Sequence, residues 1–453
     1  MSEKKNTTRS RRDFLKTTGL VATGAMLSGG LAPRVHAAEN NTIKVALVGC
    51  GGRGTGAAIN ALNTGTQGPV KLWALADAFP HRVENTFRVI ANEFDEDQVD
   101  VGDRKFTGLG AYKQAIDTLD SGDLVMFGTP PAFRPYEMEY AVEKGVNLFM
   151  EKSFCVDGPG YRKIQAAAEK ATQKNLKVAG GLMTRHDPGV EECIKRIHDG
   201  QIGEVIASWV YRVHGVFPCG PRGNLSPLQH QLQNFNCFTW LCGSFALDWM
   251  IHNLDAACWA RNEWPVSCQG QGGRQVRTTQ DQMFDHCAYE YSFADGSQMM
   301  VQLRQQDNTW GFFGAVINGT KGTAILGEGQ ENVSRIIKDR NWKVGFAKPE
   351  NLIWQYGGDH LNKYQVEVDR LVAAIRADKP YNEASRCADA SMVGIVGRMA
   401  TESGKQILWN DVVQSDVPLT PDLDKLDLNG PSPVMPNENG DYEIAKPGIT
   451  EPR

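Results

Sequence analysis

Short, continuous apolar runs recur through the chain between residues 43 and 181. Each is bounded by Gly, Pro or Asp, and they lie at Ile43–Val48, Val70–Ala76, Leu124–Phe127, Val146–Met150 and Leu176–Ala179. Runs of this kind are typical of strands that are buried on both faces of a parallel sheet. Because helix-like segments separate them, the pattern predicts an α/β domain over residues 38–181, built on a doubly wound parallel sheet of the Rossmann type.

The second half of the chain changes to longer segments in which apolar and polar residues alternate. These segments are Val205–His214, Asp285–Phe293, Gln298–Gln305 and Phe312–Asn318. Alternation predicts strands with one packed face, so we expect a second α/β domain over residues 182–411, with an open, mainly antiparallel sheet. Helical patterns at His360–Ala377 and Ala388–Ser403 close this domain. Residues 412–453 are rich in Pro, Asp, Asn and Gly and predict an extended tail, either a surface strap or loosely ordered.

The first 37 residues have the pattern of an export signal. The stretch SRRDFLK, Ser10 to Lys16, precedes the weakly apolar run Thr17–Leu31 and the small-residue site Val35–Ala37. This order predicts a twin-arginine signal peptide over residues 1–37; the alternative, a transmembrane anchor, needs about 20 strongly apolar residues. We therefore expect an exported, periplasmic protein that meets the twin-arginine export machinery and keeps no membrane anchor after cleavage. Since that route carries folded proteins, a dinucleotide bound in the cytoplasm can travel inside the fold.

Composition narrows the possible partners. The chain has 453 residues, enough for two or three domains, and a formal net charge of -5, which gives no indication of a nucleic-acid partner. Its 10 cysteines are scattered, with no CxxC pair and no metal-like cluster, so we predict no metal site. An oxidising compartment would permit disulfides, but folding in the cytoplasm favours small buried thiols.

A glycine-rich turn follows the first predicted strand. Its sequence, GCGGRG, fits the G-x-G-x-x-G motif in the context the motif requires, between a strand and a helix. The residues expected to hold the phosphates of a dinucleotide are Gly49, Gly51, Gly52, Arg53 and Gly54. Asp77 ends the second strand, where a carboxylate binds the ribose hydroxyls of NAD. The cofactor is therefore predicted to be NAD, with NADP possible because Arg53 or Arg82 could offset a 2′-phosphate.

Two further strand ends carry candidate residues at the expected cofactor edge. Thr129 and Pro130 follow one strand, and Glu151 and Lys152 follow another. Ligands of open parallel sheets lie at the carboxyl ends of the strands, so these positions favour a role in binding or catalysis. For the charged pair, a solvated turn is the alternative.

The segment DWMIHNLD supplies a candidate acid–base pair. On a helix Asp248 and His252 are four residues apart and share a face, and a carboxylate beside an imidazole raises its basicity. Such a pair suits removal of a proton from a sugar hydroxyl, although a buried structural pair is equally compatible with the spacing. The aromatic segment Phe235–Trp240 could stack on sugar faces or belong to the core. Asp285 with His286 is expected to be structural, and Asp359 with His360 to cap a helix.

Together these motifs resemble the Gfo/Idh/MocA oxidoreductase family, and its exported, twin-arginine-signal members most of all. The likeness spans about residues 43–411 and includes the glycine loop, the Thr-Pro-Pro strand end, the Glu-Lys pair, the Asp-x-x-x-His helix and the segments AIRADKP and SGKQILW. The resemblance implies a dinucleotide domain followed by a sugar-binding, often oligomerising domain, and hence a homo-oligomer with a small sugar substrate. It also implies that Lys152 contacts the substrate hydroxyl, that His252 is the acid–base residue and that Asp248 supports it.

The chain departs from the family pattern at two places. Ser153 stands where the family usually has proline after the lysine, which removes a constraint on Lys152, and Phe133 and Arg134 occupy the region where a histidine is frequent. Three functions stay open at this level. They are a sugar or polyol oxidoreductase with tightly bound NAD(P), a glycosidase that oxidises its substrate transiently, and a sugar-binding protein without turnover.

Overall fold

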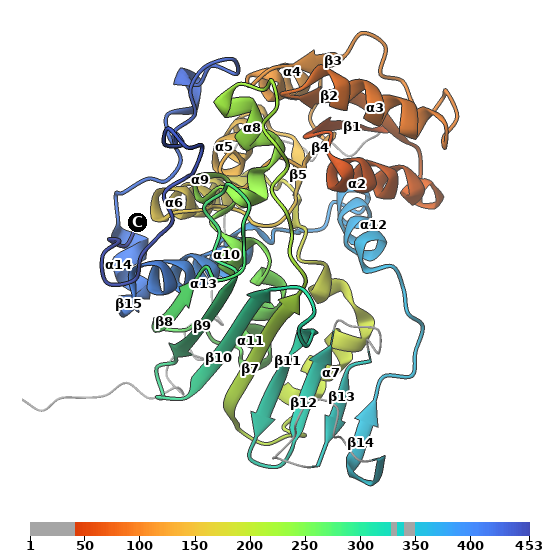
Figure 1. The fold of residues 1–453 in the computed structure, drawn as a ribbon. Coiled ribbons are helices and arrows are strands. Elements are labelled where there is room, and N and C mark those ends of the chain that lie inside the picture. The colour runs from red at the N-terminus through yellow and green to blue at the C-terminus, as the bar shows by residue number, and fades with distance from the viewer. Residues whose placement is uncertain (1–40, 328–332, 339–348) are drawn as a thin grey trace, which may run out of the picture. The chain divides into compact units, whose positions relative to one another are not determined.

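The computed structural model describes residues 41–327, 333–338 and 349–453, all within one compact unit, Asn40–Arg453. The predicted signal peptide, residues 1–37, lies outside the described residues. Within this unit the strands form two sheets (Figure 1).

The first sheet has six parallel strands in the order β3-β2-β1-β4-β5-β6. In that order their bounds are Lys105–Thr107, Val70–Asp77, Ile43–Val48, Leu124–Phe127, Asn147–Met150 and Val178–Gly180. This confirms the predicted doubly wound sheet. The order reverses between β1 and β4, so their carboxyl ends flank the crevice in which such sheets bind ligands.

Helices cover both faces of the first sheet. Their bounds are α2 (Gly52–Leu62), α3 (Pro80–Ala91), α4 (Ala111–Asp117), α5 (Arg134–Lys144) and α6 (Gly158–Gln173). Along β1, Val45 and Leu47 pack with α2 and α3, whereas Ala46 and Val48 pack in the cluster that contains α4, α5 and α6. Alternate residues of one strand thus enter two cores, which is why the strands are continuously apolar.

Helix α12 (Lys363–Arg376) lies between strands of the second sheet in the chain but packs beside α2 (Figure 1). Val368 and Leu371 belong to the same apolar cluster as β1 and α2. The Asn60 side chain donates to the Tyr364 carbonyl at 3.1 Å, and Gln365 donates back to the Asn60 carbonyl at 2.9 Å. The helix that the sequence pattern placed in the second domain therefore completes the first.

The second sheet has nine strands in the order β14-β13-β12-β11-β7-β10-β9-β8-β15. Their bounds, in that order, are Leu352–Gln355, Arg335–Ile337, Thr323–Gly327, Phe312–Gly319, Val205–His214, Gln298–Gln305, His286–Ser292, Ser267–Gly273 and Ile407–Leu408. Among the described strand pairs of this sheet, only β7 and β10 run parallel. The predicted, mainly antiparallel second sheet is confirmed.

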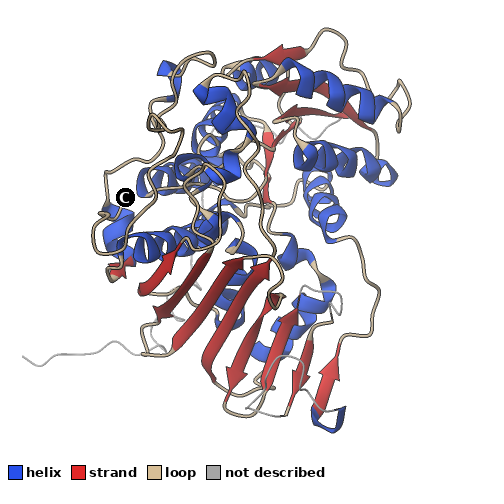
Figure 2. Ribbon diagram, in the orientation of Figure 1, coloured by secondary structure: helices blue, strands red, loops and turns tan. Residues whose placement is uncertain are grey.

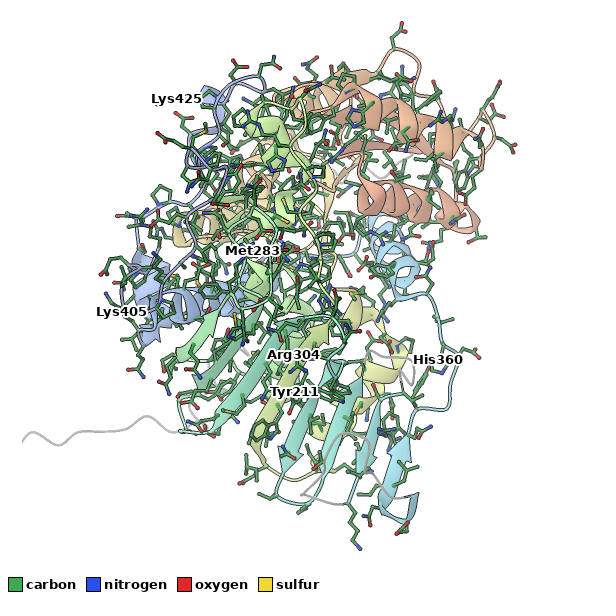
Figure 3. All side chains as sticks on the ribbon, in the orientation of Figure 1. Tyr211, Met283, Arg304, His360, Lys405 and Lys425 are labelled. Carbon is green, nitrogen blue, oxygen red and sulfur yellow. The ribbon has the colours of Figure 1, made fainter. Side chains whose placement is uncertain are left out.

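One face of the second sheet is covered and the other is open. The covering helices are α7 (Pro188–His198), α11 (Ile251–Arg261) and α13 (Ala384–Ser403). Of these, α7 and α11 lie behind the strands in Figure 2. Tyr211 of β7 and Arg304 of β10 lie on neighbouring strands in Figure 3. Tyr211 packs edge-to-face on Trp310 and Phe312 rather than under a helix. The open face thus carries large, partly exposed aromatic side chains.

Short helices lie in the connections between strands or follow the last strand. They are α8 (Pro227–Gln233), α9 (Thr239–Cys242), α10 (Phe245–Asp248), α14 (Trp409–Gln414) and the 3-10 turns η1 (Asn63–Gln67), η2 (Met183–His186), η3 (Phe235–Cys237), η4 (Pro349–Asn351) and η5 (Leu423–Lys425). Residues 415–453 otherwise have little regular structure and follow the surface as a strap. Among the described helices, none combines the length and apolarity needed to cross a bilayer.

Candidate active site

The glycine turn between β1 and α2 is built for close backbone contacts. Gly49 has φ +93°, and a Cβ there would lie 2.6 Å from the carbonyl carbon of Gly128. A Cβ on Gly54 would lie 2.0 Å from the Gly49 carbonyl oxygen. Gly51 and Gly52, by contrast, have no described atom within 4 Å of a built Cβ. The first and last glycines therefore pack the turn, and the middle two leave an open cradle.

The start of α2 at this turn fits a pyrophosphate. No described side chain caps the helix at Gly51, so its first amides are open to an anion in the cradle. The cavity beside the turn lies at the carboxyl ends of the strands and runs from Asp77 and Arg82 to Thr129, Pro130 and Lys152. The residues present thus suit a dinucleotide.

Asp77 is fixed at the far end of this cavity. Its carboxylate accepts hydrogen bonds from the amides of Cys50, at 2.8 Å, and Phe79, at 2.9 Å. Burial raises its pKa, and those two hydrogen bonds and the charge of Arg82 act in the opposite direction. Its role in binding ribose stays a prediction, as does the choice of NAD over NADP, because Arg82 lines the same cavity.

A buried polar cluster supports the cavity wall at Thr129. The Thr129 hydroxyl donates to Glu137 at 2.5 Å, and the Arg134 guanidinium donates to the carbonyls of Thr129 and Ser153. Burial raises the pKa of Glu137 to about 7, opposed by Thr129 and Arg134. The region where the resembled family has a histidine therefore holds a buried cation that fixes two loop carbonyls.

Glu151 turns inward rather than into solvent. Its side chain forms an ion pair with Arg53 at 3.0 Å, and the residue is only 4% exposed. Burial raises the pKa of Glu151, while the charges of Arg53 and Arg134 lower it. The solvated-turn alternative for the Glu-Lys pair is therefore excluded. Instead, Glu151 connects its strand end to the glycine turn.

Lys152 is held by Asp248. Its ammonium donates to the Asp248 carboxylate at 2.9 Å and to the Asp248 carbonyl at 2.7 Å. The other carboxylate oxygen accepts from Asn236 at 2.6 Å. The peptide bond between Lys152 and Ser153 is cis. Asp248 thus accepts hydrogen bonds from the Lys152 ammonium and the Asn236 side-chain amide.

The predicted pairing of Asp248 with His252 is wrong. Helix α10 ends at Asp248 and α11 starts at Ile251, so the two residues do not share a continuous helix. His252 is 9% exposed, and its Nδ1 has no hydrogen-bond partner among the described residues. Burial, followed by the charges of Lys152, Arg212 and Lys363, holds its pKa well below the ordinary value. The imidazole is therefore neutral at physiological pH, and not made more basic by a carboxylate.

A second cavity adjoins the first and is lined by His252. Lys152 and Asp248 line both cavities. The second one combines the aromatic side chains of Phe217, Trp249, Phe313 and Tyr364 with the charged Arg212 and Lys363. Apolar faces beside charged groups suit a polyhydroxylated ring. The arrangement therefore places an imidazole and a lysine where the second cavity adjoins the first.

Comparison with known proteins was made on sequence and structure. No protein-family model matches the chain. Over 342 residues it is 23% identical to the inositol 2-dehydrogenase of Rhizobium meliloti (strain 1021), covering 74% of this chain and 89% of that protein. The aldose-aldose oxidoreductase of Caulobacter crescentus superposes with a TM-score of 0.62, at 16% identity, over 81% of this chain and 100% of that one.

Two further solved structures give similar values. The myo-inositol 2-dehydrogenase of Lactobacillus plantarum has a TM-score of 0.59 at 19% identity, over 81% of this chain and 99% of that one. A levoglucosan dehydrogenase, solved with NADH and levoglucosan, has a TM-score of 0.60 at 17% identity, over 81% of this chain and 99% of that one. The chain has the fold of these dehydrogenases.

Several residues of the second cavity had no signal in the sequence. Arg212 lies at the end of β7, Phe313 in β11 and Lys363 at the start of α12, so only the fold brings them together. Of the aromatic segment Phe235–Trp240, Phe238 and Trp240 belong to the core, and Phe235 lines the dinucleotide cavity. The sequence pattern gave no indication of a role for Asn236 beyond its being a polar residue within that aromatic segment.

The remaining acid–histidine pairs lie outside both cavities. Asp285 accepts from three backbone amides, the closest at 2.6 Å, and from His286 at 2.7 Å. Although burial raises the pKa of Asp285, these bonds lower it to about 2. The predicted cap at Asp359 is wrong, because Asn362 accepts from the Tyr364 amide and caps α12.

Proposed function

We propose that this chain is an NAD-dependent oxidoreductase of the Gfo/Idh/MocA type that acts on a sugar or polyol. The observation that carries the proposal is the pair of adjoining cavities that share Lys152 and Asp248, one against the glycine turn and one around His252. A bound nicotinamide would accept a hydride from the substrate carbon. The likeness to inositol and levoglucosan dehydrogenases supports a cyclic polyol or sugar as the hydride donor.

The chain's own residues supply the proton chemistry. The neutral imidazole of His252 has one unprotonated nitrogen, which can take the proton of the hydroxyl whose carbon loses the hydride. The Lys152 ammonium, oriented by Asp248, stabilises the negative charge that develops on that oxygen. Phe217, Trp249 and Phe313 exclude water from the ring faces.

Turnover of a panel of inositols, aldoses and anhydro sugars, followed by NADH absorbance, tests the proposal. We expect His252→Asn to reduce kcat/KM by about 10²–10⁴-fold, as for loss of an acid–base group. His198→Asn, on the exposed end of α7, is the matched control and should retain activity. Full activity of the His252 variant would remove this residue from the reaction. Release of the aryl alcohol from aryl glycosides, without net formation of NADH, would point instead to the glycosidase mechanism.

We further propose that the protein leaves the cytoplasm by the twin-arginine route with its nucleotide bound. The SRRDFLK stretch and the Val35–Ala37 site support export. The open face of the second sheet supports a homo-oligomer, because Trp209 and Trp310 are exposed there. Extraction of pyridine nucleotide from protein isolated from the exported fraction tests the first statement. The molecular mass of the protein in solution tests the second.

A further inference from the structure

Cys219 and Cys237 are separated in the sequence but lie side by side in the fold. Cys219 belongs to the segment after β7, and Cys237 ends η3. Their sulfur atoms and a carboxylate oxygen of Asp281 lie within 4.8 Å of one another. The two sulfur atoms are therefore close enough to interact directly. The sequence predicted scattered cysteines without a cluster. That prediction is wrong here, because the fold brings together residues that are far apart in the sequence.

The surroundings of this pair disfavour a cation. Asp281 accepts from Arg277 at 2.6 and 2.9 Å, from Arg274 at 3.1 Å and from Thr279 at 2.6 Å. The Arg277 guanidinium also donates to the Cys237 sulfur at 3.8 Å. Two guanidinium groups thus already neutralise the carboxylate, and a divalent metal ion would have to displace them.

The two thiols differ in access and in acidity. Cys219 is partly exposed, whereas Cys237 is fully buried. The neighbouring Cys237 thiol lowers the pKa of Cys219 to about 6, against the effect of burial and with the help of His230. The proximity of Cys219, together with burial, raises the pKa of Cys237. Cys219 is therefore the reachable and more acidic thiol, and Cys237 lies directly behind it.

We propose that Cys219 and Cys237 form a reversible disulfide by exchange with an external disulfide, either a small molecule or a protein. The Cys219 thiolate attacks one sulfur of the external disulfide, whose S–S bond breaks and releases one thiolate. The Cys237 sulfur then attacks Cys219, and the second external sulfur leaves and takes up the Cys237 proton. Two protein thiols are oxidised, and one external disulfide is reduced to two thiols.

The bridge would fasten two segments of the candidate substrate cavity to each other. Phe217, two residues before Cys219, lines that cavity, and its carbonyl accepts from Arg277 at 2.8 Å. Asn236, directly before Cys237, donates to Asp248 at 2.6 Å. Oxidation would thus lock the positions of an aromatic wall and of the amide that orients Asp248.

Thiol mapping of the full chain tests the proposal without reference to activity. Protein treated with oxidised glutathione, then alkylated and digested, should yield a peptide that joins Cys219 to Cys237, and protein treated with dithiothreitol should not. Cys237→Ser should instead retain glutathione on Cys219, and Cys219→Ser should retain none on Cys237. The oxidised wild type should melt about 3–6 °C above the reduced protein, as expected for closure of a loop of this length, and neither variant should show this shift.

Three results would overturn the inference. One is alkylation of both cysteines in wild-type protein after glutathione treatment. Another is a bridge from either residue to a different cysteine. The third is stoichiometric zinc that is lost in Cys219→Ser, which would make the cluster a metal site.

Discussion

Replacing Glu137 by Gln should flatten the pH dependence of stability between about pH 5 and about pH 8. Glu137 is buried, and burial raises its pKa from 4.5 to about 7. Between these values the unfolded chain has released the proton that the folded chain still holds, so the free energy of unfolding falls as pH rises. Integrating the two titrations over this range gives a loss of about 2.5 kcal/mol that is due to Glu137.

Urea unfolding, followed by tryptophan fluorescence at both pH values, measures this loss. The stability of Glu137→Gln relative to the wild type should rise by about 2.5 kcal/mol from the lower to the higher pH. Glu139→Gln, on the exposed part of the same helix, is the matched control and should follow the wild type. A constant difference between Glu137→Gln and wild type would refute the reasoning. It would mean that Thr129 and Arg134 keep the carboxylate ionised despite its burial.

Two predictions concern the nucleotide cavity. Gly54→Ala should lower the free energy of unfolding by about 1–3 kcal/mol, because its Cβ would lie 2.0 Å from the Gly49 carbonyl oxygen. Thermal melts measure this loss, and Gly65→Ala, whose Cβ would have no described neighbour within 4 Å, is the control. Asp77→Ala should weaken NAD binding by about tenfold or more through loss of a charged hydrogen-bond acceptor, and NADP binding by less, as fluorescence titration would show; equal losses would contradict the ribose assignment.

The fold could be predicted where local pattern and burial agree. β1 and β4 have the predicted bounds, because strands buried on both faces are continuously apolar. The glycine turn could be predicted as well, since its conformation depends on neighbours within one strand–turn–helix unit. The position of α12 could not, because its amphipathic pattern fits packing on either sheet.

The site was predictable only in part, for a related reason. Lys152 and His252 do line one cavity, but the inferred helical pairing of Asp248 with His252 assumed a continuous helix, which is broken at Trp249–Met250. The depressed pKa of His252 comes from burial and from cations that include Lys363, on a different element. Such long-range electrostatics leave no trace in residue spacing.

The surface strap has a consequence for how the cavity is completed during synthesis. Asp157, at the start of α6, accepts from the amides of Leu419 and Thr420 at 2.7 and 3.1 Å. Further along the strap, the Leu428 carbonyl accepts from Ser226 at 2.6 Å, at the start of the helix that carries Leu232 into the nucleotide cavity. These residues leave the ribosome after both sheets. During synthesis, this wall of the cavity is therefore fixed only after the strap has been made and has docked against α6 and α8.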